Sequence, residues 1–361
     1  MEVRELNVNG TAIAMATREH GEFQLWPALG EYPVWDDVTY WVMARDTVRN
    51  DAFHAAIREL ADGARVADIG TGKDALWAVA AAKAGARHVY AVEELPGPLS
   101  QANQTVRDAG LAARVTVIGG SSASVRLPEQ VDVCVSEVIG PIGSSQGAAA
   151  ILADARERFL VPQGVCVPSQ CTTMVAAVCL DEAFPDGLAF HRTSLRYVKK
   201  IFAAVGYPFD VRICLDGPVD SLIVSSAAPV ETLDFNGDLG LGAGTHIDLA
   251  VLERTRVHAL VLWINLECHA GGDVIDSLRQ STSWMPVIAP ISVDGIKVEA
   301  GDTISLDWLA TTSDDGLHPD YHITGEVIRP GRPSVPVEWE SRHHAPTFRS
   351  SGAYRTLFPE I

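Results

Sequence analysis

The chain has 361 residues, of which 47% are hydrophobic and 20% charged, and a formal net charge of −18 at pH 7. This length exceeds what one hydrophobic core usually supports, so we expect two domains, and the composition is that of a folded chain. The negative charge disfavours nucleic acid and anionic membranes as partners, and no apolar run is long enough to span a membrane.

The N-terminal region predicts a hairpin followed by helices. Residues 1–30 contain two alternating runs with Asn9 and Gly10 as their turn, and residues 31–62 are mainly helical in pattern. The opening MEVRELNVNG is too acidic and polar for a secretory signal. The six cysteines have no C-x-x-C spacing and lie mostly in apolar runs, which indicates a cytoplasmic protein without a metal site.

The stretch from Val66 to Glu93 predicts a pocket for a nucleotide-containing cofactor. An apolar run to Ile69 indicates a buried strand, and Gly70 and Gly72 allow the sharp turn into an alanine-rich helix. Glu93 ends the next apolar run, where its carboxylate would accept both hydroxyls of a ribose. The cofactor therefore contains adenosine.

Two cofactor classes fit this turn. Gly70, Gly72 and Ala75 match the G-x-G-x-x-G/A fingerprint, so an oxidoreductase using NAD(P) or FAD is an alternative. Asp68, two residues before the first glycine, favours the other class. The D-x-G-x-G pattern resembles the first motif of class I S-adenosylmethionine methyltransferases, whose cationic cofactor suits an acidic pocket without a phosphate.

Two further segments continue the pattern, VDVCVSEVIG at 131–140 and LVPQGVCVPS at 160–169. Together with YPVWDDVTYWVMARDTVRNDAF at 32–53, they resemble the protein arginine methyltransferase family. DIGTG at 68–72, SEVIGPIGSSQGA at 136–148 and the loop with a single tryptophan resemble its monomethylating branch most closely. That branch carries two tandem modules and this chain carries one. The resemblance implies a Rossmann-like α/β domain that binds S-adenosylmethionine over 63–168 and a β-barrel or sandwich over 169–330.

The resemblance also implies the site residues. Arg49 would bind the carboxylate of the cofactor, Glu137 would hold the methyl acceptor, and Tyr40 would line the active site. The expected cofactor set is Arg49, Asp68, Gly70, Gly72, Glu93 and Ser122. The reaction would be a direct displacement on the sulfonium methyl, which needs no metal.

The chain departs from the family in the acceptor pocket. The second of two family glutamates falls on Gln146, and the threonine-histidine-tryptophan loop falls on Thr282, Ser283 and Trp284. A buried cation then loses one counter-charge, which changes the acceptors that the pocket tolerates. Three interpretations stay open: an arginine methyltransferase with weaker acceptor binding, an enzyme for a less basic acceptor, and a catalytically poor member of the family. An inactive scaffold that binds the cofactor is a separate alternative.

The expected activity is transfer of a methyl group to a nitrogen, or oxygen, of a peptide, protein or small-molecule acceptor. Residues 181–210 interrupt the strands with a helix-like segment, and the resemblance implies that this arm docks on a second subunit to form a homodimer. The tail, 331–361, is expected to cap the barrel through Tyr354, Leu357 and Phe358, to enter the groove of a neighbouring subunit with the same residues, or to be disordered. His318, Asp320 and His322 alternate, but Pro319 favours a loop, and His343 and His344 are expected at the surface.

Overall fold

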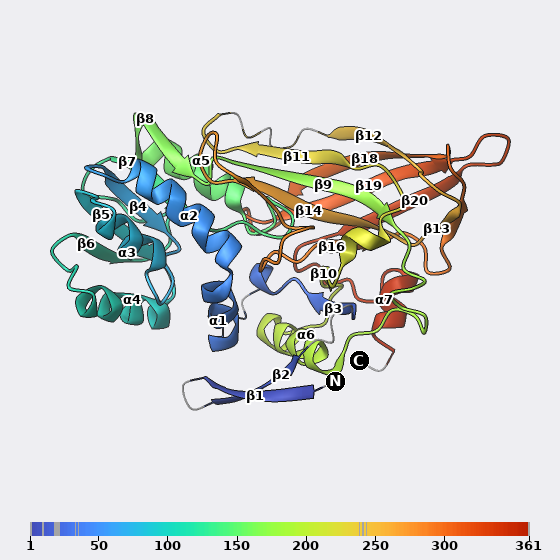
Figure 1. Ribbon diagram of the computed structural model, residues 1–361, viewed down its shortest axis with the longest axis horizontal. Coiled ribbons are helices and arrows are strands. Elements are labelled where there is room, and N and C mark those ends of the chain that lie inside the picture. The colour runs from blue at the N-terminus through green and yellow to red at the C-terminus, as the bar shows by residue number, and fades with distance from the viewer. Residues whose placement is uncertain are drawn as a thin grey trace.

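The computed structural model describes residues 2–8, 11–17, 22–32, 34, 36–237, 239, 242 and 244–359. Figure 1 shows two lobes side by side, an α/β lobe and a β-rich lobe, with the helices α1 and α2 leading into the first. This is the predicted architecture of a Rossmann-like domain followed by a β-barrel or sandwich domain.

The α/β lobe is built on a parallel sheet in the order β6-β5-β4-β7-β8. Its strands are near-continuous apolar runs because helices cover both faces. The chain leaves β4 toward β6 and later returns to its other side at β7, so the carboxyl ends of β4 and β7 flank a switch point, where such sheets bind ligands. The elements are β4 (Arg65–Ile69), α3 (Leu76–Lys83), β5 (His88–Glu93), α4 (Pro96–Asp108), β6 (Val115–Gly119), β7 (Val131–Ser136), α5 (Ala148–Arg158) and β8 (Leu160–Val167).

The N-terminal region has the predicted hairpin and helices, with one difference. Val8 pairs with Thr11 across the hairpin, and the expected turn residues Asn9 and Gly10 lie outside the described residues. The hairpin assigned to residues 1–30 ends too late, because β3 pairs with β10 in the barrel instead. The elements are β1 (Glu2–Val8), β2 (Thr11–Thr17), β3 (Gln24–Pro27), η1 (Leu29–Glu31), α1 (Asp37–Arg45) and α2 (Thr47–Leu60).

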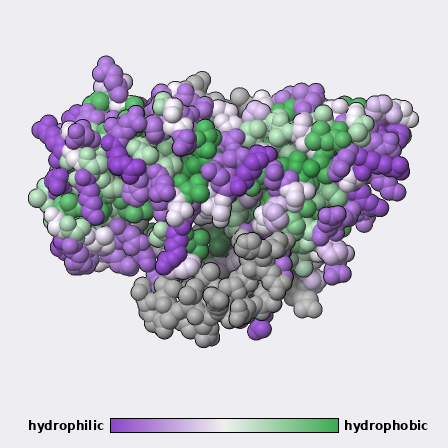
Figure 2. All heavy atoms as spheres, in the orientation of Figure 1, coloured by the Kyte–Doolittle hydropathy of each residue, from purple (hydrophilic) through white to green (hydrophobic). Residues whose placement is uncertain are grey.

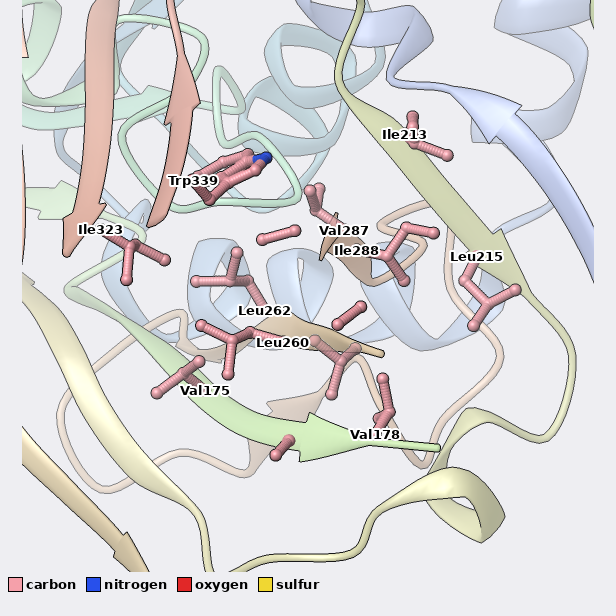
Figure 3. Close-up of a cluster of buried hydrophobic side chains, with 14 of the residues drawn as sticks. Val175, Val178, Ile213, Leu215, Leu260, Leu262, Val287, Ile288, Ile323 and Trp339 are labelled. Atoms are coloured by element: carbon pink, nitrogen blue, oxygen red, sulfur yellow. The ribbon is translucent and has the colours of Figure 1, made fainter. Parts of the chain in front are cut away.

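The β-rich lobe packs two sheets around one apolar core. The larger sheet runs β11-β9-β14-β16-β10-β3, with β15 beside β14, and the smaller runs β12-β18-β19-β20. Figure 3 shows Val175, Leu260 and Leu262 of the larger sheet facing Ile323 and Trp339 of the smaller. The strands are β9 (Gln170–Val178), β10 (Ile213–Asp216), β11 (Ala228–Asp234), β12 (Thr245–Ala250), β14 (Ala259–Glu267), β15 (Val274–Asp276), β16 (Val287–Pro290), β18 (Thr303–Thr312), β19 (Pro319–Ile328) and β20 (Val335–Ser341). A separate pair joins β13 (Thr255–Val257) to β17 (Ile296–Val298), and η2 (Val219–Leu222) follows β10.

The barrel continues beyond the boundary drawn at residue 330. β20 pairs with β19 along its length, and α7 (Gly352–Leu357) packs its apolar side chains into the barrel core. Phe358 is fully buried, and its ring lies 5.9 Å from that of Phe202. A disordered tail is therefore wrong for the described residues, and the expectation that the tail caps the barrel is confirmed.

The predicted helical arm is α6 (Arg192–Val205). His191 caps its N-terminus, and Gly206 caps its C-terminus with a left-handed φ of +96°. One face of α6 is buried and consists of Ser194, Val198, Ile201 and Phe202. This face contacts β3 and the core of its own barrel (Figure 1). The apolar side of the arm is thus satisfied within the chain, whatever the opposite side contacts.

A buried ion pair joins the N-terminal segment to the barrel. The Arg212 guanidinium lies 2.7 Å from Glu31, and both side chains are at most 1% exposed. Arg212 also donates to the carbonyl of Pro319 at 2.7 Å and to the hydroxyl of Ser341 at 2.8 Å. Because a cation without a counter-charge is costly to bury, this pair holds η1, β10, β19 and β20 together.

We predict that Glu31→Gln lowers the free energy of unfolding by about 3 kcal/mol, because it leaves the Arg212 charge buried without a partner. Urea unfolding followed by circular dichroism measures this. The control is Asp220→Asn, which breaks the exposed pair of Asp220 with Arg279 at 2.8 Å and should cost less than about 1 kcal/mol. Equal losses in the two variants would contradict the assigned role of the buried pair.

Candidate functional site

The glycine turn after β4 forms the floor of the candidate cofactor site. Gly70 and Gly72 have φ values of +74° and +64°. Residues with a Cβ atom strongly disfavour this left-handed backbone conformation. A Cβ atom built on Gly72 would lie 3.4 Å from the ring of Tyr40. Ala75, the third position of the fingerprint, also has a left-handed φ, +46°. The N–H groups of Gly70 and Thr71 donate to the Val92 carbonyl at 3.0 Å, so the turn is fixed against β5 at the carboxyl edge of the sheet.

Asp68 holds this turn from below. Its carboxylate accepts from the Thr71 hydroxyl at 2.5 Å and from the Ala78 backbone N–H at 2.9 Å, which ties the turn to α3. Burial raises the pKa of Asp68 to about 7, although these hydrogen bonds oppose the shift. The Oδ1 atom is buried and has no hydrogen-bond partner among the described residues. Asp68 thus fixes the conformation of the glycine turn through Oδ2, while Oδ1 remains a hydrogen-bond acceptor without a partner among the described residues.

Glu93 closes the same site from the end of β5. One carboxylate oxygen accepts from the Gly72 N–H at 2.9 Å and the other from the Leu95 N–H at 2.8 Å. Each oxygen retains a lone pair, because an ionised carboxylate has about four acceptor positions. An adenosine with its ribose diol toward Glu93 fits this arrangement of glycine cradle, orphaned Asp68 oxygen and carboxylate.

Tyr40 belongs to this cofactor side. Burial and the negative charges of Glu93 and Asp74 raise the pKa of Tyr40 to about 12, and the Lys73 ammonium lies 5.2 Å from the centre of the ring. These neighbours place the ring beside the glycine turn, and its role in lining the active site stays a prediction. Its contacts support a role in covering the cofactor.

Arg49 and Glu137 connect the cofactor side to the acceptor side. A guanidinium N–H of Arg49, on α2, donates to Glu137, just after β7, at 2.5 Å, and the two side chains are 4% and 7% exposed. A second N–H donates to the Met43 carbonyl at 2.8 Å. Burial raises the pKa of Glu137 to about 7, against the opposing charge of Arg49. The predicted cofactor-binding and acceptor-binding residues are therefore direct neighbours.

Asp46 is a site residue that the sequence analysis did not single out. It caps α2 by accepting from the Arg49 N–H at 2.9 Å, and its other oxygen accepts from the Ser283 N–H at 2.6 Å and hydroxyl at 2.8 Å. An aspartate before a helix could have indicated the cap. The contact with Ser283 is invisible in sequence because 237 positions separate the two.

The remaining acceptor residues lie on two loops, Gln146 between β7 and α5, and Ser283 and Trp284 between β15 and β16. The indole N–H of Trp284 donates to the Ile139 carbonyl at 2.8 Å, which ties the Ser283–Trp284 segment to the β7–α5 loop. The amide of Gln146 lies against Gly30, since a Cβ atom at Gly30 would be 2.4 Å from its Nε2 atom. Ser283 and Trp284 thus lie beside Asp46 and Ile139, whereas Gln146 lies against Gly30, and a shared acceptor pocket stays a prediction.

The β7–α5 loop is anchored to the barrel through Ser144. Its hydroxyl lies 2.6 Å from the buried carboxylate of Glu231 and 2.7 Å from the hydroxyl of Tyr321. A cavity of about 580 Å³ opens beside this anchor, lined by residues of α5, β11, β12 and β18, and neither Glu93 nor Glu137 is among its lining residues. The cavity is therefore separate from the candidate cofactor site.

Ser122 follows β6, at the carboxyl edge of the same sheet. Its carbonyl accepts a hydrogen bond from Arg158, which fixes the backbone of this segment. Its contact with the cofactor stays a prediction.

A family model for a methyltransferase domain matches residues 53–184. A protein arginine N-methyltransferase PRMT10 of Oryza sativa subsp. japonica is 40% identical over 144 residues, 39% of this chain and 37% of that protein. The chain thus aligns with about two fifths of the length of this relative. An arginine N(omega)-methyltransferase of Streptomyces achromogenes subsp. streptozoticus is 29% identical over 279 residues, 74% of each protein.

Two solved structures share the fold. The protein arginine methyltransferase 10 of Arabidopsis thaliana superposes with a TM-score of 0.66 and 22% identity, over 83% of this chain and 96% of that one. The Trypanosoma brucei PRMT1 enzyme-prozyme complex with AdoHcy gives 0.66 and 21%, over 84% and 98%. The oxidoreductase alternative gains no support from these matches. The chain carries a methyltransferase domain of the S-adenosylmethionine-dependent class, and in sequence and fold it is similar to protein arginine methyltransferases.

Proposed function

We propose that this chain transfers the methyl group of S-adenosylmethionine to a nitrogen atom of a peptide, protein or small-molecule acceptor. The observation that carries the proposal is the contact between Arg49 and Glu137, which joins the two halves of the site at the edge of one sheet. The N(omega) activity named for the Streptomyces relative, which aligns over 74% of this chain, supports nitrogen over oxygen.

The cofactor half is formed by backbone N–H groups and carboxylates. Gly70 and Gly72 leave room for the cofactor, Glu93 accepts from its ribose, Arg49 binds its carboxylate, and Ser122 completes the edge beyond β6. When bound, S-adenosylmethionine supplies an electrophilic methyl on a sulfonium. Asp68 positions the loop, and Tyr40 covers it.

The acceptor half orients a nitrogen and removes its proton. The Glu137 carboxylate accepts a hydrogen bond from the acceptor nitrogen, directing its lone pair toward the methyl group. A pKa raised to about 7 suits Glu137 to take up that proton near neutral pH. The Gln146 amide fixes the plane of the acceptor, and Ser283 and Trp284 form a wall of the pocket.

The charge of this pocket bears on which acceptor is bound. Family members hold the acceptor between two glutamates. In this chain Gln146 contributes no negative charge, and the carboxylate of Glu137 is already paired with Arg49. An arginine guanidinium in this pocket would therefore face less negative charge than two free carboxylates would provide. We infer that the pocket accepts arginine weakly, or a less basic nitrogen in its place.

The cofactor assignment predicts that Glu93→Ala and Arg49→Ala each weaken binding of S-adenosylhomocysteine by about tenfold to a hundredfold, the loss typical of a hydrogen bond to a charged group. Isothermal titration measures the affinity. Exposed neighbours of each residue serve as controls, Glu94→Ala beside the first and Arg58→Ala on the same helix as the second. Wild-type protein that binds no S-adenosylhomocysteine at high micromolar concentration would overturn the assignment.

The acceptor assignment predicts that Gln146→Glu lowers KM for an arginine-containing acceptor by about tenfold, because it restores a charged hydrogen-bond partner. The same change should raise KM for an uncharged nitrogen acceptor. Steady-state methyl transfer to both acceptors measures the two effects. Gln101→Glu adds an equal charge on exposed α4 and should change neither KM. An unchanged KM in Gln146→Glu would show that the acceptor does not meet this residue.

We further propose that the protein is a homodimer built through α6. The outer face of this helix carries exposed basic residues, Arg192, Arg196, Lys199 and Lys200, on a chain whose net charge is −18. A basic face on an acidic protein is complementary to the acidic surface of a second copy. Figure 2 shows polar residues over most of the visible face of both lobes, with hydrophobic residues in small groups.

The dimer predicts a mass of two chains at micromolar concentration in size-exclusion chromatography with light scattering. Reversing two charges, in Arg196→Glu with Lys199→Glu, should release monomers, because it makes the arm repel its acidic partner. Arg254→Glu, an exposed reversal outside the arm, should leave the dimer intact. A monomeric wild-type protein would rule out the dimer.

We place this function in the cytoplasm. The six cysteines are free thiols in the structure, as in a reducing compartment. Within the described ranges, no helix has both the length and the apolar character needed to cross a bilayer. The negative net charge opposes nucleic acid as a partner and favours basic peptides.

A further inference from the structure

The cavity beside Ser144 is a concave site outside the methyl-transfer site. Its volume of about 580 Å³ lies within the range of about 300–1,000 Å³ in which proteins bind small molecules. Ala149 and Ala150 of α5 form one side of it, and residues of β11, β12 and β18 form the other. None of the residues assigned above to the cofactor or to the methyl acceptor lines it.

Much of the cavity wall is apolar. Val230 and Leu233 come from β11, Trp308 comes from β18, and Leu317 comes from the loop before β19. Removing apolar groups from water against such a wall is favourable in proportion to the area that is buried. An occupant of this cavity therefore needs an apolar body.

One carboxylate interrupts the apolar wall, that of Glu231 on β11. Its Oε1 atom accepts from the Ser144 hydroxyl at 2.6 Å, and its Oε2 atom accepts from the Ser144 N–H at 3.2 Å and the Thr173 hydroxyl at 3.1 Å. Because the single proton of the Ser144 hydroxyl is directed at Glu231, the Tyr321 hydroxyl is the donor in its 2.7 Å contact with Ser144. The carboxylate is thus held in one orientation by hydrogen-bond donors.

The negative charge of Glu231 has no counter-ion close to it. Among the described residues no cation forms an ion pair with it, and Arg212, whose charge it feels from a distance, is paired with Glu31 at 2.7 Å. Burial raises the pKa of Glu231, against the hydrogen bonds from Ser144 and Thr173. Three donors also leave unused one of the roughly four acceptor positions of a carboxylate. A cation in the cavity would fill that position and compensate the charge.

Trp308 places an aromatic ring on the same cavity wall. The ring is 2% exposed, and the Tyr321 ring packs against it with centroids 4.9 Å apart and planes 31° apart. Tyr321 therefore connects the two features of the wall, since its ring supports Trp308 and its hydroxyl donates to Ser144. Aromatic rings attract organic cations, most strongly when the ring is that of tryptophan.

The histidines near this cavity do not extend its polar wall. His318 lies between two lining residues, but its ring stacks on that of His343, with centroids 4.0 Å apart and planes 10° apart. Its Nδ1 atom lies 2.6 Å from the carboxylate of Asp315. Because nearly parallel rings cannot direct their nitrogen lone pairs at one point, this cluster is not suited to hold a metal ion. Glu231 is the one titratable side chain among the lining residues that the structure describes.

Two expectations about these histidines are wrong. Pro319 begins β19, so Asp320 and His322 lie on a strand and not in the predicted loop. His343 is 8% exposed and is therefore not a surface residue. His322 pairs with Glu338 at 3.0 Å, on the neighbouring strand β20.

We propose that this cavity binds a small organic amine in its cationic form. Its ammonium group donates to Glu231 with the ring of Trp308 nearby, and its apolar body lies against Val230 and Leu233. A neutral ligand would leave the carboxylate uncompensated, and an anion would be repelled by it. A primary amine attached to an aromatic group has the required chemistry.

The site lies against the loop that carries Gln146. Ser144 and Gly147, on either side of Gln146, both line the cavity. A Cβ atom at Gly147 would lie 2.7 Å from the Leu317 side chain, so the loop is packed closely against this wall. The occupant is a ligand separate from the methyl acceptor, because Glu137 is not among the lining residues.

The test is isothermal titration of the full chain with tryptamine, a primary amine on an indole ring. Indole-3-ethanol carries a hydroxyl in place of the ammonium group, and indole-3-propionate carries a negative charge. We expect tryptamine to bind one site at least tenfold more tightly than indole-3-ethanol, and indole-3-propionate not to bind. Absence of tryptamine binding at millimolar concentration, or equal affinity for tryptamine and indole-3-ethanol, would overturn the proposal.

Two variants assign the binding to this cavity. Glu231→Gln removes the charge with little change of shape and should weaken tryptamine binding at least tenfold while leaving indole-3-ethanol binding unchanged. Glu326→Gln, the same substitution at an exposed position of β19, should bind tryptamine as the wild type does. Tryptamine binding that is unchanged in Glu231→Gln would show that the amine lies elsewhere.

Ala150→Leu fills the cavity from the side of α5 and keeps Glu231 intact, so it tests the site even if Glu231→Gln fails to fold. Leucine is a good helix former, and circular dichroism establishes that each variant is folded. The Ala150→Leu variant should lose binding of both tryptamine and indole-3-ethanol, and wild-type affinity for tryptamine in it would contradict the proposal. The heat of binding is measured without any methyl transfer, so these outcomes are independent of the proposed activity.

Discussion

The site depends on a single carboxylate, that of Asp46. One of its oxygens starts α2 and thereby sets the direction of the Arg49 side chain toward Glu137. Its other oxygen holds Ser283, which lies in the opposite lobe. Because Asp46 is nearly buried, these bonds form away from competing water and are worth more than they would be at the surface. The cofactor side and the acceptor side keep their spacing through this residue.

Both buried guanidiniums near the site are matched by one carboxylate each, Arg49 by Glu137 and Arg212 by Glu31. The other buried carboxylates of the site, Asp46, Asp68 and Glu93, accept hydrogen bonds from backbone N–H or hydroxyl groups. An incoming cation would compete with Arg49 for Glu137. Gln146, which stands where the family has its second glutamate, would supply no second carboxylate to that cation.

Features that depend on residues close together in the sequence could be predicted. The glycine turn, the acid at the end of β5 and the strand before Glu137 each depend on a few neighbouring residues, and the family resemblance supplied the order of the two lobes. Features made by distant segments could not be predicted. The burial of His343 arises from Tyr32 and His318, the role of Asp46 from Ser283, and the strand character of β20 from its pairing with β19.

The pairing of β3 with β10 has a consequence for how the protein is made on the ribosome. Residues 24–27 leave the ribosome early but find their partner only once residues 213–216 have followed, and the smaller sheet stays incomplete until β20 has emerged. The α/β lobe needs no residue beyond β8 to complete its parallel sheet. Its nascent form can therefore fold first and serve as a template on which the barrel, with its many long-range pairings, assembles more slowly.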